Sequence, residues 1–377
     1  MQLAVTGYQD TFLTGDPQLS YYQKVFTKRA GYTSEILRLA FDSEVRFGGS
    51  SICTIDNDTC DIITGFYINF QYPQAQTVMQ DAGHAYIERA ELLVGGQTIV
   101  SMTGELMAVL SDLKDPQRTR TNYDRMLRRN VSQTSYGRNS NSNSFYVEIP
   151  FFGRTYTNSF PLVALNRHTI QVNLVMRSQE ELANAILPEV ELVVQAIYID
   201  QEHKNFFLGR QMDYVIQQYQ LARVNLTNLN KIRFKTLFQN PTKEFILIVQ
   251  NDTGTDGVFD YSSHKSTNYV NYSNDQVTDW KMFLNGQKYF ELDQITMRAI
   301  QPYEHYIQTP NYKINVFNVG NNTDENPSGT INMSRISGQT FEIGLVDITN
   351  TTRKLRLYAV GFNVFRCQGG LGGTLFV

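Results

Sequence analysis

Two short stretches of this chain, LLVGGQTI (92–99) and MFLNGQKYF (282–290), follow nearly the same pattern although roughly half of the sequence separates them. Aligning Gly96 with Gly286 also matches the glutamine that follows each of them. Gly-Gly and Asn-Gly are the residue pairs that two-residue hairpin turns prefer, because both central positions need a positive φ. Each stretch therefore predicts a β-hairpin, and their likeness suggests an internal duplication.

Three further pairs of segments follow the two hairpins in the same order. Each member has the alternating or apolar pattern of a β-strand, with turn residues at its ends. The pairs are FYVEI (145–149) with YKINVF (312–317), TIQVNLV (169–175) with TFEIGLV (340–346), and VVQAIYID (193–200) with LYAVGFNV (357–364). One matching hairpin could arise by chance, whereas four matched pieces in one order predict a duplicated β domain.

Most of the remaining chain has the same character. Runs such as GFYINF (65–70), KIRFKTLF (231–238) and FILIVQ (245–250) alternate or stay apolar over strand lengths. Strands do not alternate with helices, which argues against a parallel sheet. The pattern predicts an all-β protein of antiparallel sandwiches or barrels.

Two segments depart from the strand pattern. GELMAVLSDLKD (104–115) has four apolar residues at helical spacing and is followed by Pro116, so a short helical insertion is predicted there. Those four residues are Leu106, Met107, Leu110 and Leu113. The stretch 202–220, between the halves, is polar and loosely amphipathic, and we expect a short helix or turn followed by a linker.

The length and charge of the chain limit the classes of function that it can have. A chain of 377 residues suits two domains of ordinary size, and 41% hydrophobic residues suffice for two cores. Lys and Arg number 33 against 36 Asp and Glu, so no overall field favours nucleic acid or a membrane surface.

Cysteine use and the absence of targeting patterns point to a soluble protein of cytosolic origin. Three cysteines, Cys53, Cys60 and Cys367, make no disulfide framework and indicate a reducing compartment. A Cys53–Cys60 bridge is the less favoured alternative. The start of the chain lacks a basic signal region, and no apolar run reaches the ~20 residues of a membrane helix.

The opening stretch GYQDTFLTGDPQLSYYQKVFTKRAGYTSE (7–35) resembles the N-terminal signature of the double jelly-roll major capsid proteins of nucleocytoplasmic large DNA viruses. The matching positions are Gln9, Asp10, Leu13, Thr14, Gly15, Pro17, Gln18, Lys28, Arg29, Tyr32 and Glu35. Further matches lie in order along the chain, among them PLVALNRHTIQVNL, IYIDQEHKNFF, NPTKEF, IQPYEHY, NPSGTINMSRI and LYAVGFNVFRCQGGLGG. The resemblance covers essentially the whole chain.

The resemblance implies two tandem eight-stranded antiparallel jelly rolls with short helical insertions. We expect an N-terminal arm over 1–30, a first jelly roll over 31–205, a linker over 206–222 and a second jelly roll over 223–377. The implied function is that of a capsid subunit of the virion, which forms pseudo-hexagonal homotrimeric capsomers that tile an icosahedral shell. The implied partners are the chain itself and neighbouring capsomers, with assembly in the host cytoplasm.

The arm itself carries apolar residues that favour contact with other proteins. Its tyrosines, phenylalanines and leucine predict that it lies beneath the capsomer, against a neighbour or an inner layer, although packing on its own domain is an alternative. Minor capsid or cement proteins are the expected contacts of the arm, and an inner membrane beneath the shell is a further candidate.

No catalytic residue, cofactor or metal is predicted. The histidines are scattered without a zinc spacing, at His84, His168, His203, His264 and His305. In DNDTCD, Asp56, Asp58 and Asp61 could hold calcium, but the glycine of an EF-hand is missing and a polar hairpin tip is favoured. GGLGG (369–373) lacks the Lys-Ser/Thr of a phosphate loop and is interpreted as a tail needing positive φ angles.

Two surface features are open to a second interpretation. The arginines of 118–129 (Arg118, Arg120, Arg125, Arg128, Arg129) could face nucleic acid, but Tyr123 alone offers a stacking ring, so no direct nucleic-acid binding is expected. Glycosylation sequons begin at Asn57, Asn130, Asn225, Asn251, Asn271, Asn321, Asn332 and Asn350, and a cytosolically assembled protein would not meet the usual machinery.

Three alternative functions stay beside the major capsid hypothesis. A minor capsid protein of the same fold would share all the features above, and copy number per virion would distinguish it. A carbohydrate-binding attachment module would need an exposed aromatic and acidic loop, for which 260–275 (DYSSHKSTNYVNYSND) is the candidate. A cupin-like metalloenzyme is the weakest alternative because its histidine set is missing.

Overall fold

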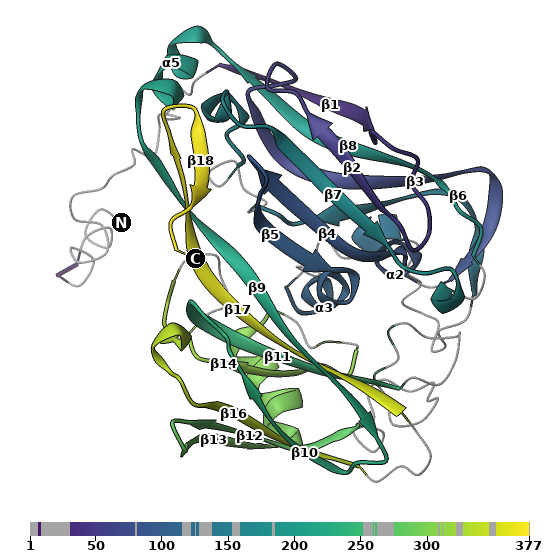
Figure 1. The fold of residues 1–377 in the computed structure, drawn as a ribbon, viewed down its shortest axis with the longest axis vertical. Coiled ribbons are helices and arrows are strands. Elements are labelled where there is room, and N and C mark those ends of the chain that lie inside the picture. The colour runs from purple at the N-terminus through teal and green to yellow at the C-terminus, as the bar shows by residue number, and fades with distance from the viewer. Residues whose placement is uncertain are drawn as a thin grey trace.

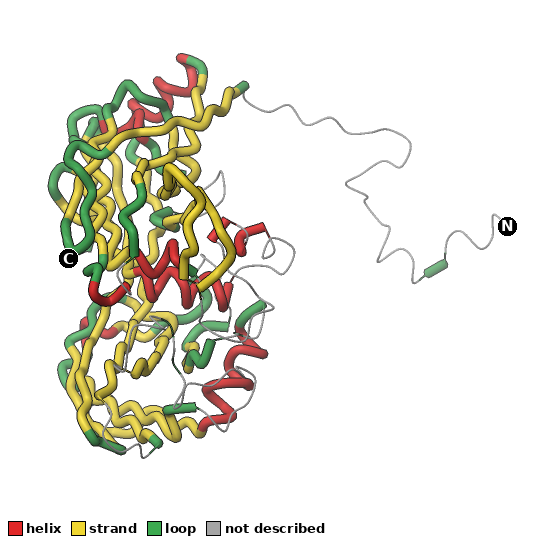
Figure 2. The backbone as a smooth tube through the Cα atoms, turned by 90° about the vertical axis from the view of Figure 1, so that its right-hand side faces the viewer, coloured by secondary structure: helices red, strands yellow, loops and turns green. Residues whose placement is uncertain are grey.

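The computed structural model describes residues 7–8, 31–79, 81–114, 122–124, 126–127, 138–152, 159–182, 185–251, 259, 261, 275–307, 310, 312–321, 327–346 and 352–376. These residues form two β-sandwiches, which lie one above the other in Figure 1. Figure 2 shows helical segments between the strands of the upper sandwich and those of the lower one. No described helix is long and apolar enough to cross a membrane.

The first sandwich contains eight strands and most of the helical insertions. Its strands are β1 (Tyr32–Ala40), β2 (Ser50–Ile55), β3 (Ile62–Met79), β4 (Ile87–Val94), β5 (Gln97–Thr103), β6 (Arg138–Ile149), β7 (Ile170–Met176) and β8 (Glu189–Ile199). Its helices are α2 (Ala82–Tyr86), α3 (Gly104–Lys114), η3 (Leu162–Leu165), η4 (Glu180–Leu182) and, at its end, α5 (Gln201–Gly209).

The second sandwich repeats the arrangement with additional short elements. Its strands are β9 (Met212–Thr227), β10 (Lys231–Thr236), β11 (Pro241–Asn251), β12 (Val277–Leu284), β13 (Gln287–Asp293), β14 (Asn315–Asn318), β15 (Ile331–Asn332), β16 (Gln339–Leu345), β17 (Thr352–Gln368) and β18 (Leu371–Thr374). Its helical segments are η6 (Thr296–Ile300), α6 (Gln301–His305) and η7 (Met333–Arg335).

Both halves have the same strand order, which confirms the predicted duplication and the double jelly-roll fold. The sheets of the first half run β1-β8-β3-β6 and β2-β7-β4-β5. Those of the second run β9-β17-β11-β14 and β10-β16-β12-β13, with β18 and the two-residue β15 added at the margins. The four matched sequence pieces occupy equivalent strands: the β4–β5 and β12–β13 hairpins, then β6 and β14, β7 and β16, and β8 and β17.

The two hairpins that suggested the duplication are alike in detail. Gly95 and Gly96 have φ of 58° and 82°, and Asn285 and Gly286 have φ of 50° and 86°. These are the left-handed conformations that glycine and asparagine adopt most readily. In each hairpin the strand register also shifts between the second and third residue pairs, counted from the turn. The matched residues therefore form the same turn, with a register shift at the same position in both hairpins.

The strand β11 of the second jelly roll is buried on both faces, which explains its unbroken apolar run. In β11, Phe245, Leu247 and Val249 face the core of the second roll, whereas Ile246 and Ile248 pack into the core of the first. All five are at most 1% exposed. A strand covered on both faces has no solvent side, so it loses the alternation of polar residues.

The predicted helix over 104–115 is present as α3 and lies between the two jelly rolls (Figure 1). Its four apolar residues are buried as expected. Its polar residues Glu105, Ser111 and Asp112 are buried as well, because the second roll covers the side that would otherwise face water. The amphipathic pattern thus predicted the helix correctly, but it did not predict that the polar side of the helix is buried as well.

The stretch expected to be a linker, 206–222, contains the end of α5 and the first part of β9. A short helix is present, as predicted, in α5, but Met212 begins the sixteen-residue strand β9. β9 pairs with β17 from Met212↔Cys367 to Thr227↔Thr352, and the resulting ribbon passes beside both jelly rolls (Figure 1). Its Gln- and Tyr-rich sequence hides the strand period because many of its side chains are only half-buried.

Candidate functional site at the junction between the two jelly rolls

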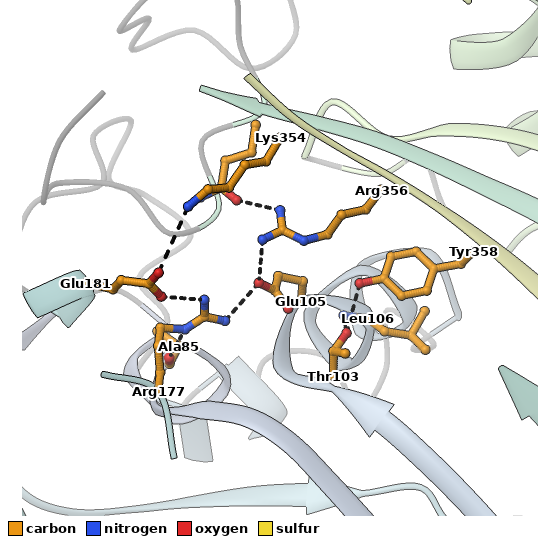
Figure 3. Close-up of polar contacts among 10 residues, drawn as sticks. Ala85, Thr103, Glu105, Leu106, Arg177, Glu181, Lys354, Arg356 and Tyr358 are labelled. Carbon is orange, nitrogen blue, oxygen red and sulfur yellow. Dashed lines mark hydrogen bonds and ion pairs between the residues drawn. The ribbon is translucent and has the colours of Figure 1, made fainter. Parts of the chain in front are cut away.

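A cluster of buried charged residues joins the first jelly roll to the second (Figure 3). Glu105 lies in the first turn of α3, Arg177 directly follows β7, and Arg356 belongs to β17. The Glu105 carboxylate lies 2.8 Å from Arg177 Nη2 and 3.2 Å from Arg356 Nη2. One carboxylate of the first roll therefore holds a guanidinium from each roll.

Neighbouring groups accept further hydrogen bonds from these two guanidinium groups. Arg177 donates to the carbonyl of Ala85 at 2.9 Å and to Glu181 at 3.2 Å. Arg356 donates to the side-chain oxygen of Gln250 at 2.7 Å. Buried charges of this kind are tolerated only where partners replace water, and here each cation has at least two.

The electrostatics of Glu105 follow from this geometry. Burial alone would raise the pKa of its carboxyl, but Arg177 and Arg356 outweigh that effect and lower the pKa to about 2. Glu105 is also in the first turn of a helix, where a negative charge is favourable. The carboxylate is thus ionised throughout the physiological range and clamps the two rolls.

A hydroxyl pair extends this contact on the same side of α3. Thr103 and Tyr358 hydroxyls lie 2.8 Å apart, and Thr103 Oγ1 also accepts from the Leu106 amide at 3.3 Å. Burial raises the pKa of Tyr358 well above its ordinary value, so its hydroxyl keeps its proton. β17 is thereby hydrogen-bonded to the start of α3.

A second ion pair crosses the junction at the other end of α3. Lys114 Nζ lies 2.6 Å from Glu244 of β11, which is fully buried and also accepts from the Tyr306 hydroxyl at 2.6 Å. Burial alone would raise the pKa of Glu244, but Lys114 and Lys243 lower it. Both ends of α3 are therefore tied to the second roll by charge.

Tyr312 of the second roll reaches the polar groups beside α2 and α3. Its amide donates to Asp112 at 2.8 Å, and its hydroxyl donates to Asp81 at 3.2 Å. Asp81 is also 2.8 Å from Nδ1 of the buried His84, whose Nε2 is 3.2 Å from the Tyr123 hydroxyl. His84 is accordingly part of the junction rather than a metal site, and Tyr123 is not an exposed stacking ring.

The C-terminal hairpin closes the junction at the opposite edge. Gly369 and Gly370 have φ of 62° and 84°, as predicted, but they form the turn of the β17–β18 hairpin rather than a tail. Arg167 N donates to Gly370 O at 3.0 Å, and Gly372 N donates to His168 Nδ1 at 3.2 Å. A Cβ on Gly372 would lie 2.4 Å from Leu165 Cδ2 and 2.8 Å from Phe365 Cζ, so a larger residue at this position would require these side chains to shift.

A cavity of about 480 Å³ opens between the rolls beside the charged cluster. The first roll contributes Gly48, Glu88, Glu105, Arg177, Ser178 and Glu181, and the second contributes Arg223, Asn225, Lys354, Leu355 and Arg356. We call this space the junction cavity. It is polar, and its walls come from both jelly rolls.

The other residues considered for metal or calcium binding do not form a cluster in the described part of the structure. Among the described residues, no group of three His, Cys, Asp or Glu side chains has the placement of a metal site. Asp61 is 2.9 Å from Lys204 Nζ and accepts from the Ile199 amide. Asp56 and Asp58 are exposed in a turn, which connects β2 of one sheet to β3 of the other and so is not a hairpin tip.

The remaining histidines and the cysteines also have ordinary roles. His203 Nδ1 contacts Asp200, which caps α5, and His305 Nδ1 is 3.2 Å from the Asn321 carbonyl oxygen. The thiols of Cys53, Cys60 and Cys367 are free and buried. The Cys53–Cys60 alternative is therefore wrong for this structure.

Several predicted surface features lie outside the described residues. These are the arm over 1–30 except residues 7–8, the five arginines of 118–129, His264, and the sequons at Asn130, Asn271 and Asn350. Of the candidate attachment loop, Tyr261 and Asp275 are described and both are buried. Asn225, Asn321 and Asn332 are exposed, whereas Asn57 donates to the His168 carbonyl.

Sequence reasoning missed the junction residues. Glu105, Arg177 and Arg356 each stand in or beside an apolar run, and Glu244 directly precedes FILIV. A charged residue inside a run that is otherwise buried was the available signal. Its partner lies far away in the sequence, so the pairs themselves had no local pattern.

Comparison with known proteins places the chain in a family. Residues 20–218 match the model of the major capsid protein N-terminus, and residues 204–373 match that of the large eukaryotic DNA virus major capsid protein. The major capsid protein of Pyramimonas orientalis virus is 27% identical over 410 residues, covering 100% of this chain and 98% of that protein. The major capsid protein of Paramecium bursaria Chlorella virus 1 is 24% identical over 445 residues, covering 100% and 98%.

Solved structures share the fold. The chain superposes on a quasi-atomic model of the PBCV-1 virus capsid with a TM-score of 0.81 and 20% identity, covering 95% of this chain and 100% of that one. The Faustovirus major capsid protein gives a TM-score of 0.73 at 9% identity, covering 95% and 94%. The named relatives are structural proteins of viral capsids. With the family models matched in succession over both jelly rolls, this chain belongs to the major capsid protein family of the large eukaryotic DNA viruses.

Proposed function

We propose that the chain is a major capsid protein whose three copies form a closed, pseudo-hexagonal capsomer, and that such capsomers tile an icosahedral shell. The observation that carries the proposal is the repeated strand order of the two jelly rolls. Three copies around a threefold axis present six similar rolls, and six similar edges suit hexagonal packing. The names of the relatives support the same assignment.

The junction gives the proposed capsomer its rigidity. A subunit whose rolls moved independently would present its six edges at variable angles. The ion pairs at both ends of α3, the shared core around β11 and the C-terminal hairpin on η3 oppose such motion. The charged cluster thus serves assembly by fixing one roll relative to the other.

Further partners belong to the same proposal. We place the arm over 1–30 against minor capsid or cement proteins beneath the capsomer, with the rolls over 31–205 and 223–377 forming the wall. The first strand after the arm leaves Tyr32 and Ile36 55% and 66% exposed, which suits continued contact with a neighbour. The protein would then reside in the virion, after assembly in the host cytoplasm and above any inner membrane.

The mass of the full-length protein in solution tests the proposal. Light scattering should give about 130 kDa, three times the 43.2 kDa of one chain, because closed threefold symmetry fixes the stoichiometry. A well-folded chain that stays monomeric at high concentration would contradict the capsomer and favour a glycan-binding module. Copy number per virion then separates a major from a minor capsid protein.

A further inference from the structure

The two jelly rolls meet through surfaces that a second copy of the chain can meet in the same way. The second roll turns the outer face of its β9-β17-β11-β14 sheet, the face away from its own core, towards the first roll. Ile246, Ile248 and Tyr358 of this face pack into the core of the first roll. The first roll contributes α3, which follows β5 and lies against the same sheet (Figure 1). A sheet face therefore meets the helix that follows the fifth strand.

Both surfaces have an equivalent elsewhere in the same chain. By the shared strand order, the β1-β8-β3-β6 sheet of the first roll corresponds to β9-β17-β11-β14. The eleven-residue α3 corresponds to η6 and α6, of five residues each, which follow β13 as α3 follows β5. The duplication thus provides each junction surface twice, whereas a single chain joins only one pair of them.

The helical equivalent has an exposed apolar side. Met297 and Tyr306 are buried, whereas four other apolar or aromatic residues of this segment are 58%, 43%, 85% and 67% exposed: Ile295, Ile300, Tyr303 and Ile307. The first three follow one another at five and three residues, which keeps them on one side of a helix that begins with a π turn. The four apolar residues of α3 are all buried instead. Grouped exposed apolar side chains of this kind mark an interaction surface.

The strand before each helix differs in the same way. When the two hairpin turns are aligned, Ile99 of β5 corresponds to Tyr289 of β13. Ile99 is 1% exposed, and its carbonyl accepts from Gln218 of β9 at 3.0 Å. Tyr289 is 47% exposed. The position that meets the second roll inside the chain is therefore open to solvent in its equivalent.

The equivalent sheet face also exposes apolar side chains. Gln195 of β8 corresponds to Tyr358 of β17, because the alanine that follows each of them faces its own core. Ile36 of β1 pairs with Gln195, and Leu221 of β9 pairs with Tyr358, so Ile36 and Leu221 are equivalent. Leu221 packs against the core of the first roll, whereas Ile36 is 66% exposed. Tyr32, on the same side of β1, is 55% exposed.

We propose that η6, α6 and Tyr289 of one chain dock on the outer face of the β1-β8-β3-β6 sheet of a second copy. This contact repeats between chains the junction that α3 makes within one chain. Because the two surfaces differ, the contact is heterologous, and three of them close a ring in which first and second rolls alternate. The inference rests on the proposed capsomer and names the surfaces that hold its chains together.

Glutamate on either surface tests the proposal in the full-length protein. Ile36→Glu alters the sheet face and Tyr303→Glu alters the helix, and both side chains are exposed in the single chain, so the chain itself should fold unchanged. An unpaired charge buried in an apolar contact disfavours that contact. In light scattering over a dilution series, each variant should raise the concentration at which the ~130 kDa trimer separates into 43.2 kDa chains by at least about tenfold.

The matched control is Leu237→Glu, since Leu237 is 85% exposed, as Tyr303 is, but lies on neither surface. It should separate at the same concentration as the unaltered protein, and circular dichroism should show all three variants folded. If the unaltered protein is a trimer and either Ile36→Glu or Tyr303→Glu separates no more readily than Leu237→Glu, the interface is wrong while the capsomer stands. If the unaltered protein is a monomer, both are wrong.

Discussion

Replacing Glu105 by glutamine removes one charge and almost no volume at the centre of the junction. In the native protein this carboxylate holds Arg177 and Arg356, both less than one-tenth exposed. Glutamine can accept a hydrogen bond from one of them but cannot neutralise either. The variant therefore leaves excess buried positive charge between the two jelly rolls.

The size of the loss can be estimated in two ways. The pKa of Glu105 is lowered from 4.5 to about 2, and at 1.36 kcal/mol per unit this corresponds to about 3 kcal/mol of stability. Removing one partner from a buried ion pair typically costs ~3–5 kcal/mol. We therefore expect Glu105→Gln to lower the free energy of unfolding at pH 7 by roughly 3 kcal/mol.

The pH dependence gives an independent signature. Because the native pKa is below the unfolded one, the contribution of Glu105 is complete above pH 4.5 and is lost as pH falls towards 2. The native protein should thus lose about 2 kcal/mol from this group by pH 3. Glu105→Gln lacks this loss, so the two proteins should converge in stability at acid pH.

Urea unfolding, followed by the emission of the single, fully buried Trp280 and by circular dichroism, measures both effects. The matched control is Glu181→Gln, which touches the same Arg177 from a carboxylate that is 47% exposed and should cost less than about 1 kcal/mol. Equal losses from the two substitutions, or a loss from Glu105→Gln that is as large at pH 3 as at pH 7, would refute the reasoning.

Three further outcomes follow from particular contacts. Lys114→Met should destabilise the protein by about 3 kcal/mol at neutral pH in urea unfolding, and by less at acid pH where Glu244 is protonated; a pH-independent loss would contradict the ion pair. Gly286→Ala should cost about 1–2 kcal/mol through its φ of 86° alone, whereas Gly372→Ala should lower the thermal midpoint further because its Cβ would meet Leu165. Ellman's reagent should detect no thiol in the native protein and three after denaturation, because burial raises the thiol pKa values to about 12; early reaction of Cys53, Cys60 or Cys367 would show local opening.

The fold was predictable because its signals are local. The Gly95–Gly96 and Asn285–Gly286 turns can be recognised from residue type, since both central positions need positive φ. The strands that follow them alternate with a period of two wherever one face meets water. β7, with alternately buried and half-buried residues, is an example. The duplication then follows from comparing the halves.

The junction and β9 were not predictable in the same way. The Glu105–Arg356 and Lys114–Glu244 pairs join residues that are far apart in the chain, so no periodicity reveals them. β9 carries a mixed sequence because its strand runs beside both rolls, and its side chains are neither clearly exposed nor clearly buried. Burial of α3 on its polar side likewise depends on the second roll, which its own sequence cannot indicate.

Electron-microscope class averages of the purified full-length protein test the central claim most directly. The account predicts a particle of three chains with a hexagonal outline and six lobes, which alternate between first and second jelly rolls because each chain supplies one of each. A particle with a single pair of lobes, or a ring whose lobes are not a multiple of six, would contradict it.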